Sequence, residues 1–524
     1  MLPRLLSGLV CALLILPAPR PAYHLNVLAR GVRQALERLP PGQMVRVVVH
    51  LADANNPPEP EQDVEVWLRQ RAAVSQAPIH AWLRRREAAG DVGEVISFWI
   101  FNGLAVTASR EAVLEMARRP DVERIALDEV RLAPSRTRGL SPEHCQNLAP
   151  GASSDACHSE RSEVSLPRIR ETLRFAQGDG VPENLIAIGA PQAWARGFTG
   201  KGVVVALLDS GVDMTHPDLA ARWRGGTNSW LDPYGEHPDA PFDVNGHGTQ
   251  ALGVILGGDA GGSPIGVAPE AQWIAAKIFD DRDRATVEGI HQALQWALDP
   301  DGDPSTPDAP DVINNSWSFV NAGCDAEFAD DLRALRAAGI LPVFAAGVRD
   351  SVSPANTPEA FAVGALADGQ TVLSDSPRGP SMCDGQPVFP HVVAPGANIR
   401  TTDRFGLYAT LSGTSLAAAH VSGALALLLQ ADPALGVDEQ EAILIDTAVD
   451  LGEPGPDDVF GHGRIDIAAA LDHALGSGSA QARSTSTAAP ASPPAASGAW
   501  PWVVAGGMLV LALVIFAMRR KAAK

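Results

Sequence analysis

Short, almost wholly apolar runs recur along the second half of the chain. Strands that are buried on both faces lose the alternation of apolar and polar positions, so such runs indicate a parallel sheet covered by helices. The runs stand at 203–208, 273–279, 312–314, 340–346 and 391–396. Helical patterns lie between them, for example at 286–298 and 325–338. The pattern predicts an α/β domain with a mostly parallel sheet over residues 183–475.

The first part of the chain arranges strands and helices differently. Strand-like runs cover 44–51, 94–101, 104–109 and 122–127, and helical patterns cover 61–89 and 109–119. We expect the first helix to break at Pro78, because proline lacks a backbone N–H. Asn102-Gly103 is a hairpin signal. The order strand, helix, strand, strand, helix, strand predicts a small ferredoxin-like α+β domain at 43–132. Residues 133–182 show no clear period and are interpreted as a linker or insertion.

Both ends of the chain have the form of targeting segments. Residues 1–22 join an early arginine to a short apolar run and a Pro-rich end, which is typical of a secretory signal peptide. Residues 500–518 carry no charge and precede the basic segment 519–524, so they predict a transmembrane helix with a cytoplasmic tail. Residues 476–498 are rich in Ser, Ala and Pro and predict a flexible linker. We therefore expect an exported chain whose body is anchored to the cell membrane from outside the cytoplasm.

Net charge and cysteine content indicate which partners and which cross-links to expect. The chain of 524 residues has a formal charge of −20, which argues against a nucleic-acid partner, because phosphate binding needs basic patches. Once the predicted signal peptide is removed, four cysteines remain, as expected for disulfides in an oxidising compartment. We pair Cys324 with Cys383, since both follow successive strands of the α/β domain, and Cys145 with Cys157. Neither pair has the spacing of metal ligands.

Three residues could act together as a catalytic set. Asp209 follows the first apolar strand directly, where ligands collect in parallel sheets. His247 lies between glycines that leave room for a substrate backbone, and Ser415 begins a long apolar helix. Each alone could be a cap or a loop residue. A serine is a weak nucleophile unless a histidine removes its proton and a carboxylate orients that histidine, and this set supplies all three groups.

The three segments closely resemble the active-site signatures of the subtilase (S8) family, in the family's order Asp, His, Ser. They read LLDSGVDMTHPDL, NGHGTQALG and SGTSLAAAHVSGALALLL. DVINNSWS and SPANTPEAFAVGA look most like the bacillopeptidase F branch. The resemblance implies a subtilisin-like three-layer domain and serine endopeptidase activity on protein or peptide substrates.

The resemblance also implies roles for individual residues. Asp209 orients His247, His247 is the general base and then the general acid, and Ser415 attacks the peptide carbonyl. Extended substrate pairs with the strand at Ser316, Trp317 and Ser318. The resemblance implies that no cofactor is required. Structural calcium is common in the family, and Asp218 matches a family ligand position, although the other ligands have no match. The 43–132 domain resembles an inhibitory propeptide, so the chain's own propeptide is expected to be a partner.

Three positions depart from the family pattern. Val348 stands where the family has an asparagine that donates to the oxyanion, Ala419 replaces a proline, and Ser318 replaces a glycine. Two hypotheses therefore stay open, an attenuated protease and a pseudoprotease that binds peptides or serves as a scaffold. Loss of one oxyanion donor costs on the order of 10²–10³ in rate. Enzymes commonly gain at least ~10⁶, so activity survives that loss. An α/β-hydrolase esterase is excluded, because that fold needs the order Ser, acid, His.

Overall fold

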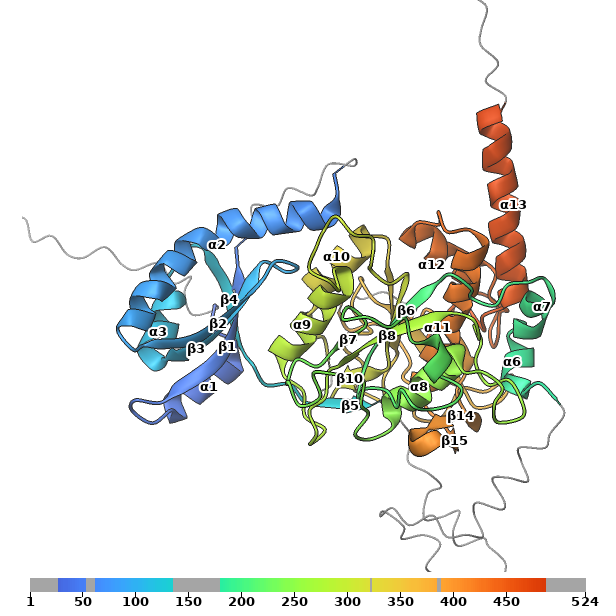
Figure 1. Cartoon of the computed structure of the whole chain (residues 1–524), viewed down its shortest axis with the longest axis horizontal. Coiled ribbons are helices and arrows are strands. Elements are labelled where there is room, and N and C mark those ends of the chain that lie inside the picture. The colour runs from blue at the N-terminus through green and yellow to red at the C-terminus, as the bar shows by residue number, and fades with distance from the viewer. Residues whose placement is uncertain (1–26, 53–61, 135–179, 321–322, 384–387, 487–524) are drawn as a thin grey trace, which may run out of the picture. The chain divides into compact units, whose positions relative to one another are not determined.

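A seven-stranded parallel sheet forms the centre of the α/β domain (Figure 1). The computed structural model describes residues 27–52, 62–134, 180–320, 323–383 and 388–486. In sheet order the strands are β13 (Val392–Pro395), β12 (Phe361–Leu366), β11 (Leu341–Ala345), β9 (Val312–Asn315), β6 (Val204–Asp209), β8 (Gln272–Lys277) and β7 (Trp230–Leu231). All five predicted strands are present, and the predicted parallel α/β fold is confirmed.

Helices cover both faces of this sheet. They are α6 (Glu183–Ala187), α7 (Ala190–Ala195), α8 (His247–Leu256), α9 (Val287–Leu298), α10 (Ala329–Ala337), α11 (Thr414–Ala431), α12 (Val437–Asp446) and α13 (Ile467–Ser486). On β6, Val205 and Leu207 join the core that contains α8 and α11. Ala206 and Leu208 join the opposite core, which contains α9 and α10. Alternate side chains of one strand thus supply two cores, which makes the domain three-layered.

Smaller elements complete the domain. The strands β14 (Ile399–Asp403) and β15 (Leu407–Leu411) form a hairpin, and 3₁₀ turns cover Ala220–Arg222 and Arg404–Gly406. A two-stranded antiparallel sheet pairs β10 (Trp317–Phe319) with β5 (Leu132–Pro134). β5 begins just ahead of the region interpreted as a linker, and α6 begins directly after it.

A four-stranded antiparallel sheet precedes the α/β domain. Its order is β2 (Val92–Phe98), β3 (Gly103–Ser109), β1 (Met44–Leu51) and β4 (Val122–Leu127), accompanied by α1 (Arg30–Arg38), α2 (Val64–Ala88) and α3 (Arg110–Met116). This order agrees with the ferredoxin-like topology expected from the sequence. The hairpin between β2 and β3 lies at Asn102-Gly103, and α1 was not expected.

The predicted break at Pro78 is wrong, because α2 runs through it. Buried side chains stand on both sides of the proline, with Leu68 and Ala72 before it and Ile79 and Leu83 after it. Interior proline costs a helix about 3 kcal/mol, which burial of several apolar side chains at about 1.5–3 kcal/mol each can offset. Packing therefore overrides the local signal.

Helix α11, which begins with Thr414 and Ser415, is buried over almost its whole length. Every residue from Thr414 to Leu429 is buried. Among the described residues it is the one helix long and apolar enough to cross a membrane, and 89% of it is buried inside the protein. That burial identifies it as a core helix rather than a membrane span.

Several predictions, about the ends of the chain and about one cysteine pair, lie outside the described residues. These are the signal peptide at 1–22, the transmembrane helix at 500–518, the basic tail at 519–524 and the pair Cys145–Cys157. Helix α13 continues to Ser486, into the predicted linker at 476–498. A formed helix adds residues at little cost, because only its first turn has to be nucleated.

A disulfide joins Cys324 to Cys383, with their Cα atoms 4.7 Å apart. It connects the loop after β10 to the loop after β12 and closes a separation of 59 residues. We predict that this bond forms in the protein under oxidising conditions and that replacing both cysteines by alanine lowers the free energy of unfolding by about 2–4 kcal/mol. Non-reducing peptide mapping checks the pairing, and denaturant unfolding checks the magnitude. Recovery of both thiols free would contradict it.

Candidate active site

Asp209 ends β6 at the carboxyl edge of the sheet. The side chain is fully buried, and its Oδ1 accepts a hydrogen bond from Ser210 N at 2.7 Å. Helix α8 starts close by with His247, followed by Gly248. A Cβ atom at Gly248 would lie 2.1 Å from the carbonyl oxygen of Gly211, so only glycine permits this approach. Gly248 thus lets the α8 backbone lie against the loop after β6.

His247 connects the other two predicted residues. Its Nδ1 lies 2.8 Å from Asp209 Oδ1, and its Nε2 lies 3.0 Å from Ser415 Oγ. Because the carboxylate can only accept, we assign the ring proton to Nδ1, which leaves Nε2 as an acceptor. The backbone N–H of His247 donates to Asn245 Oδ1 at 2.8 Å, which fixes the start of the helix. The structure therefore brings Asp209, His247 and Ser415 into one hydrogen-bonded chain.

Ser415 lies in the first turn of α11 and is 2% exposed. Its Oγ is also 3.0 Å from the carbonyl oxygen of Ser316, and the Ser316 hydroxyl donates back to the Ser415 carbonyl at 3.0 Å. These two bonds tie the start of α11 to the segment before β10. The N-terminus of a helix carries partial positive charge and free N–H groups, so it favours an anion at this point.

Asp243 was not predicted from the sequence, yet it holds the loops of the site together. It accepts from Ser210 Oγ at 2.9 Å and from Thr249 Oγ1 at 2.6 Å. Ser210 Oγ in turn accepts from Gly248 N at 2.9 Å. Burial raises the pKa of the Asp243 carboxyl, and the hydrogen bonds to Thr249 oppose that shift. The sequence offered one signal for this role, namely that Asp243 stands four residues before His247.

The strand expected to bind substrate is paired with another part of the same chain. In the antiparallel pair of β10 and β5, Trp317 is opposite Pro134 and Ser318 is opposite Ala133. Ser316 and Ser318 are fully buried, and the indole nitrogen of Trp317 and the hydroxyl of Ser318 have no hydrogen-bond partner among the described residues. The segment that follows the N-terminal domain thus occupies the edge where an extended peptide is expected.

Val348 lies beside the start of α11. The preceding carbonyl, of Gly347, accepts from Thr414 Oγ1 at 2.8 Å. The backbone of Val348 pairs with Ser351 in both directions, at 3.1 Å and 3.0 Å. Its isopropyl side chain has no donor, so this position cannot supply the amide hydrogen bond that an asparagine would give to the oxyanion.

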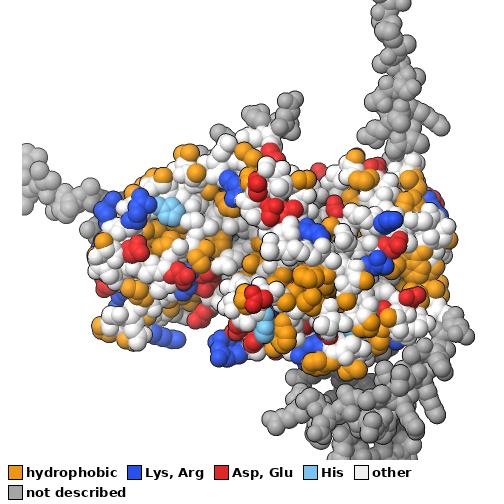
Figure 2. Space-filling model, in the orientation of Figure 1, with side chains coloured by type: hydrophobic (Ala, Val, Ile, Leu, Met, Phe, Trp, Pro, Cys, Tyr) orange, Lys and Arg blue, Asp and Glu red, His pale blue; other side chains and the backbone are white. Residues whose placement is uncertain are grey.

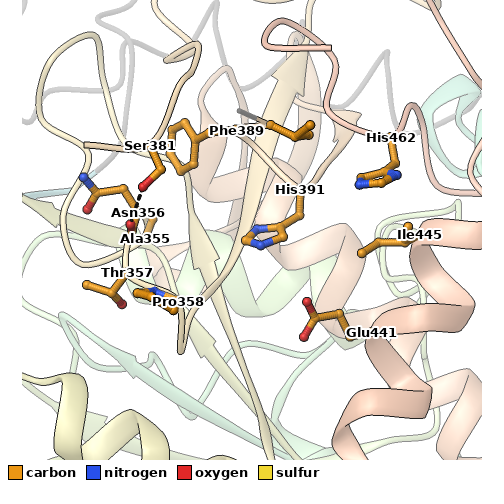
Figure 3. Close-up of a pocket in the computed structure, with 11 residues that line it drawn as sticks. Ala355, Asn356, Thr357, Pro358, Ser381, Phe389, His391, Glu441, Ile445 and His462 are labelled. Atoms are coloured by element: carbon orange, nitrogen blue, oxygen red, sulfur yellow. Dashed lines mark hydrogen bonds between the residues drawn. The ribbon is translucent and has the colours of Figure 1, made fainter. Parts of the chain in front are cut away.

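Asn356 does not replace the missing amide. Its Nδ2 donates to the carbonyl of Gly323 at 3.2 Å, and its Oδ1 accepts from Ser353 Oγ at 2.7 Å. It lines a separate cavity of about 220 Å³ that contains no residue of the triad (Figure 3). In that view Asn356 and Ser381 stand on one side, and His391 and His462 on the other. The amide of Asn356 is therefore engaged away from Ser415.

Asp218, the residue matched to a calcium position, is bonded to protein groups through both carboxylate oxygens. Oδ1 accepts from Ala260 N at 2.7 Å, and Oδ2 accepts from the Tyr408 hydroxyl at 2.6 Å. Burial and the adjacent carboxylate raise the pKa of Tyr408, so the phenol remains a donor. These contacts give Asp218 a structural role in linking the loop before α8 to β15.

Two groups of described side chains bring three metal-type donors together, with the ligand atoms within 4.8 Å of one another. They are His50, His291 and Glu327 in one group, and Asp299, Asp301 and Asp308 in the other. Neither includes a triad residue. In the acidic group Arg69 already pairs with Asp299. On the face shown in Figure 2, basic and acidic side chains are interspersed.

A family profile and several known proteins are similar in sequence to this chain. The sequence profile of the Subtilase family matches residues 200–463. Bacillopeptidase F of Bacillus subtilis (strain 168) is 33% identical over 445 residues, which are 79% of this chain and 29% of that protein. The alkaline protease of Alkalihalobacillus alcalophilus is 31% identical over 365 residues, 69% of this chain and 86% of that protein. Subtilisin BL of Lederbergia lenta is 33% identical over 293 residues, 55% and 98% of the two chains.

The family match covers about half of the chain and includes the positions of all three triad residues. The chain spans less than a third of the length of Bacillopeptidase F, but most of the length of the two shorter proteases. Subtilases need no cofactor for catalysis, and many bind structural calcium. On the fold, the geometry and these matches, the chain belongs to the subtilase family of serine proteases.

Proposed function

We propose that this chain is an exported, membrane-anchored serine endopeptidase that hydrolyses peptide bonds with Asp209, His247 and Ser415. The hydrogen-bonded chain from Asp209 through His247 to Ser415 is the observation that carries the proposal. The distances of 2.8 Å from His247 Nδ1 to Asp209 Oδ1 and 3.0 Å from His247 Nε2 to Ser415 Oγ are normal hydrogen-bond lengths. Export and anchoring rest on the sequence of the two ends.

Proton transfer follows from the assigned tautomer. Ser415 Oγ gives its proton to His247 Nε2 as the oxygen attacks the substrate carbonyl, and Asp209 stabilises the imidazolium through Nδ1–H. His247 then returns the proton to the leaving amine, and an acyl-enzyme remains. Water repeats the sequence on the acyl-enzyme, releases the acid product and restores Ser415.

The tetrahedral intermediate needs donors for its oxyanion. The N–H groups at the start of α11 lie beside Ser415 and supply part of this stabilisation. Val348 supplies none from its side chain. Turnover should therefore be reduced relative to a site with an amide there. The alternative function is a pseudoprotease that binds peptides without cutting them, and Val348 is the observation that favours it.

Inhibition by the N-terminal domain completes the proposal. The 43–132 domain leads directly into β5, and β5 pairs with the expected substrate strand β10. A segment held there occupies the edge that a substrate would use. We propose that the domain is an inhibitory propeptide and that its connection to the catalytic domain is the first bond cut.

A fluorophosphonate probe tests the central claim, because it labels only an activated serine. We predict labelling of the wild-type protein at Ser415 and none in Ser415→Ala. Asp209→Asn should slow labelling on the order of 10⁴-fold, since an amide can donate to His247 Nδ1 and so stabilise the wrong tautomer, and it carries no charge to stabilise the imidazolium. Mass spectrometry locates the adduct. A folded wild type that reacts no faster than Asp209→Asn would favour the pseudoprotease.

Self-processing is the second prediction of the proposal. The wild-type precursor should shorten with time by a cut near Ser135, whereas Ser415→Ala should remain full length. Gel electrophoresis and N-terminal sequencing of purified protein measure both. The same cut in both proteins would show that another protease makes it, and no cut in either would argue against the propeptide role.

The third prediction concerns the missing oxyanion donor. Val348→Asn should raise kcat more than it changes KM, because the added hydrogen bond strengthens as charge develops on the oxyanion. The gain should be at most on the order of 10²–10³-fold. Steady-state kinetics on a peptide substrate measure it.

Val348→Leu is the matched control, because it changes size without adding a donor, and it should give no gain. Val348→Asn combined with Ser415→Ala should be inactive. An unchanged kcat in Val348→Asn, with a fast wild type, would mean that another donor already serves the oxyanion.

A further inference from the structure

A buried group of imidazole and carboxylate side chains lies away from the triad. His50 comes from β1 of the N-terminal domain, whereas His291 lies on α9 and Glu327 precedes α10. Their exposed fractions are 6%, 0% and 7%. One ligand atom of each lies within 4.8 Å of the other two. None of these groups takes part in the proposed catalytic chemistry, so their burial calls for another explanation.

The orientation of His291 resembles that of a metal-bound imidazole. Its Nδ1 lies 2.9 Å from Asp331 Oδ1, and both side chains are fully buried. In a neutral ring that donates its Nδ1 proton to Asp331, Nε2 keeps a lone pair for a metal ion. Nε2 is buried and makes no hydrogen bond to any described residue, and Glu327 Oε1 is 3.6 Å away. A carboxylate that orients the far nitrogen of an imidazole is the usual outer partner of a metal ligand.

His50 has two neighbours that one ring nitrogen cannot satisfy. Its Nε2 lies 2.7 Å from Glu327 Oε1 and 2.8 Å from Arg124 Nη2. If Nε2 carries a proton, that proton suits Glu327 but opposes the N–H of Arg124. If Nε2 carries a lone pair, that lone pair suits Arg124 but faces the oxygen of Glu327. A cation held between Nε2 and Oε1 removes the conflict once Arg124 turns away.

The residues around His50 allow a metal ion to take the place of the Arg124 guanidinium. The Arg124 side chain is 36% exposed, so its guanidinium can move into water. The rings of Phe101 and His291 are stacked with centroids 3.9 Å apart, and the rings of Phe98 and His291 lie 5.6 Å apart. An apolar wall of this kind excludes water and strengthens the attraction between an ion and its ligands.

We propose that His50, His291 and Glu327 form a Zn²⁺ site that bridges the N-terminal domain and the α/β domain. Two imidazole nitrogens and one carboxylate oxygen are a common zinc ligand set, with a fourth position for water. Ligand atoms around tetrahedral zinc lie about 3.3 Å apart, and the 2.7 and 3.6 Å separations here lie on either side of that value. The ion would hold the N-terminal domain in place, a consequence that rests on the proposed inhibitory role of that domain.

Zinc binding is measured on the full-length Ser415→Ala chain, which cannot cut itself. The metal-free protein is titrated with Zn²⁺ alone in competition with a chelating dye. We expect one tightly bound equivalent. His50→Gln and Glu327→Gln, each in that background, should lower the affinity by at least on the order of 10-fold to 100-fold. X-ray absorption of the zinc-loaded protein should show two imidazole ligands.

Two further variants guard against misfolding and nonspecific binding. Arg124→Ala should bind Zn²⁺ more tightly, because it removes the guanidinium that pairs with His50 and Glu327 and replaces none of the three proposed ligands. His237→Gln is the matched control, since His237 also pairs with a carboxylate, Asp281, at 3.0 Å but belongs to no three-donor group among the described residues. It should leave the affinity unchanged.

Absence of a bound equivalent, or equal affinity in the parent and both ligand variants, would overturn the proposal and leave a protonated imidazole–carboxylate network. Because the titration needs no proteolysis, it can fail while the proposed protease activity stands.

Discussion

Burial of α11 is the constraint on which the site depends. The helix packs against α8 and against five strands of the central sheet, and its buried run begins at the residue before Ser415. At Gly423 a Cβ atom would lie 2.6 Å from the Cβ of Val267, so the helix can approach this closely only without a side chain there. Since α8 begins with His247, the distance between base and nucleophile is set by core packing. Interiors pack like crystals, so that distance is held tightly.

The N-terminal domain is attached by packing as well as by charge. Val48, Phe98 and Phe101 belong to the same buried core as residues of α9 and α10. Asp128 Oδ1 accepts from Glu288 N at 2.7 Å, which places a carboxylate at the start of α9, where the helix dipole favours it. Detachment would expose this apolar surface and several buried charges. A cut in the connecting chain therefore need not release the domain at once.

Local signals were reliable where a few neighbouring residues decide the outcome. The apolar runs identified the central strands, because burial on both faces requires apolar side chains at every position. The Asn-Gly pair predicted its hairpin correctly, because these two residues readily adopt the backbone conformation of a tight turn. Pro78 misled for the opposite reason, since side chains packed from other elements hold α2 intact. β12 was missed as a strand, although all of its residues, Phe361–Leu366, are buried.

For the site, the sequence alone determined which groups are present and in what order. It supplied Asp209, His247 and Ser415 with their flanking glycines, and it showed that Val348 has no amide. Only the tertiary structure decided the distances, the role of Asp243 and the pairing of β5 with β10. It also brought His50 beside His291 and Glu327, more than two hundred positions away in the chain. Such contacts depend on how separate elements pack, and no local pattern of residues encodes that packing.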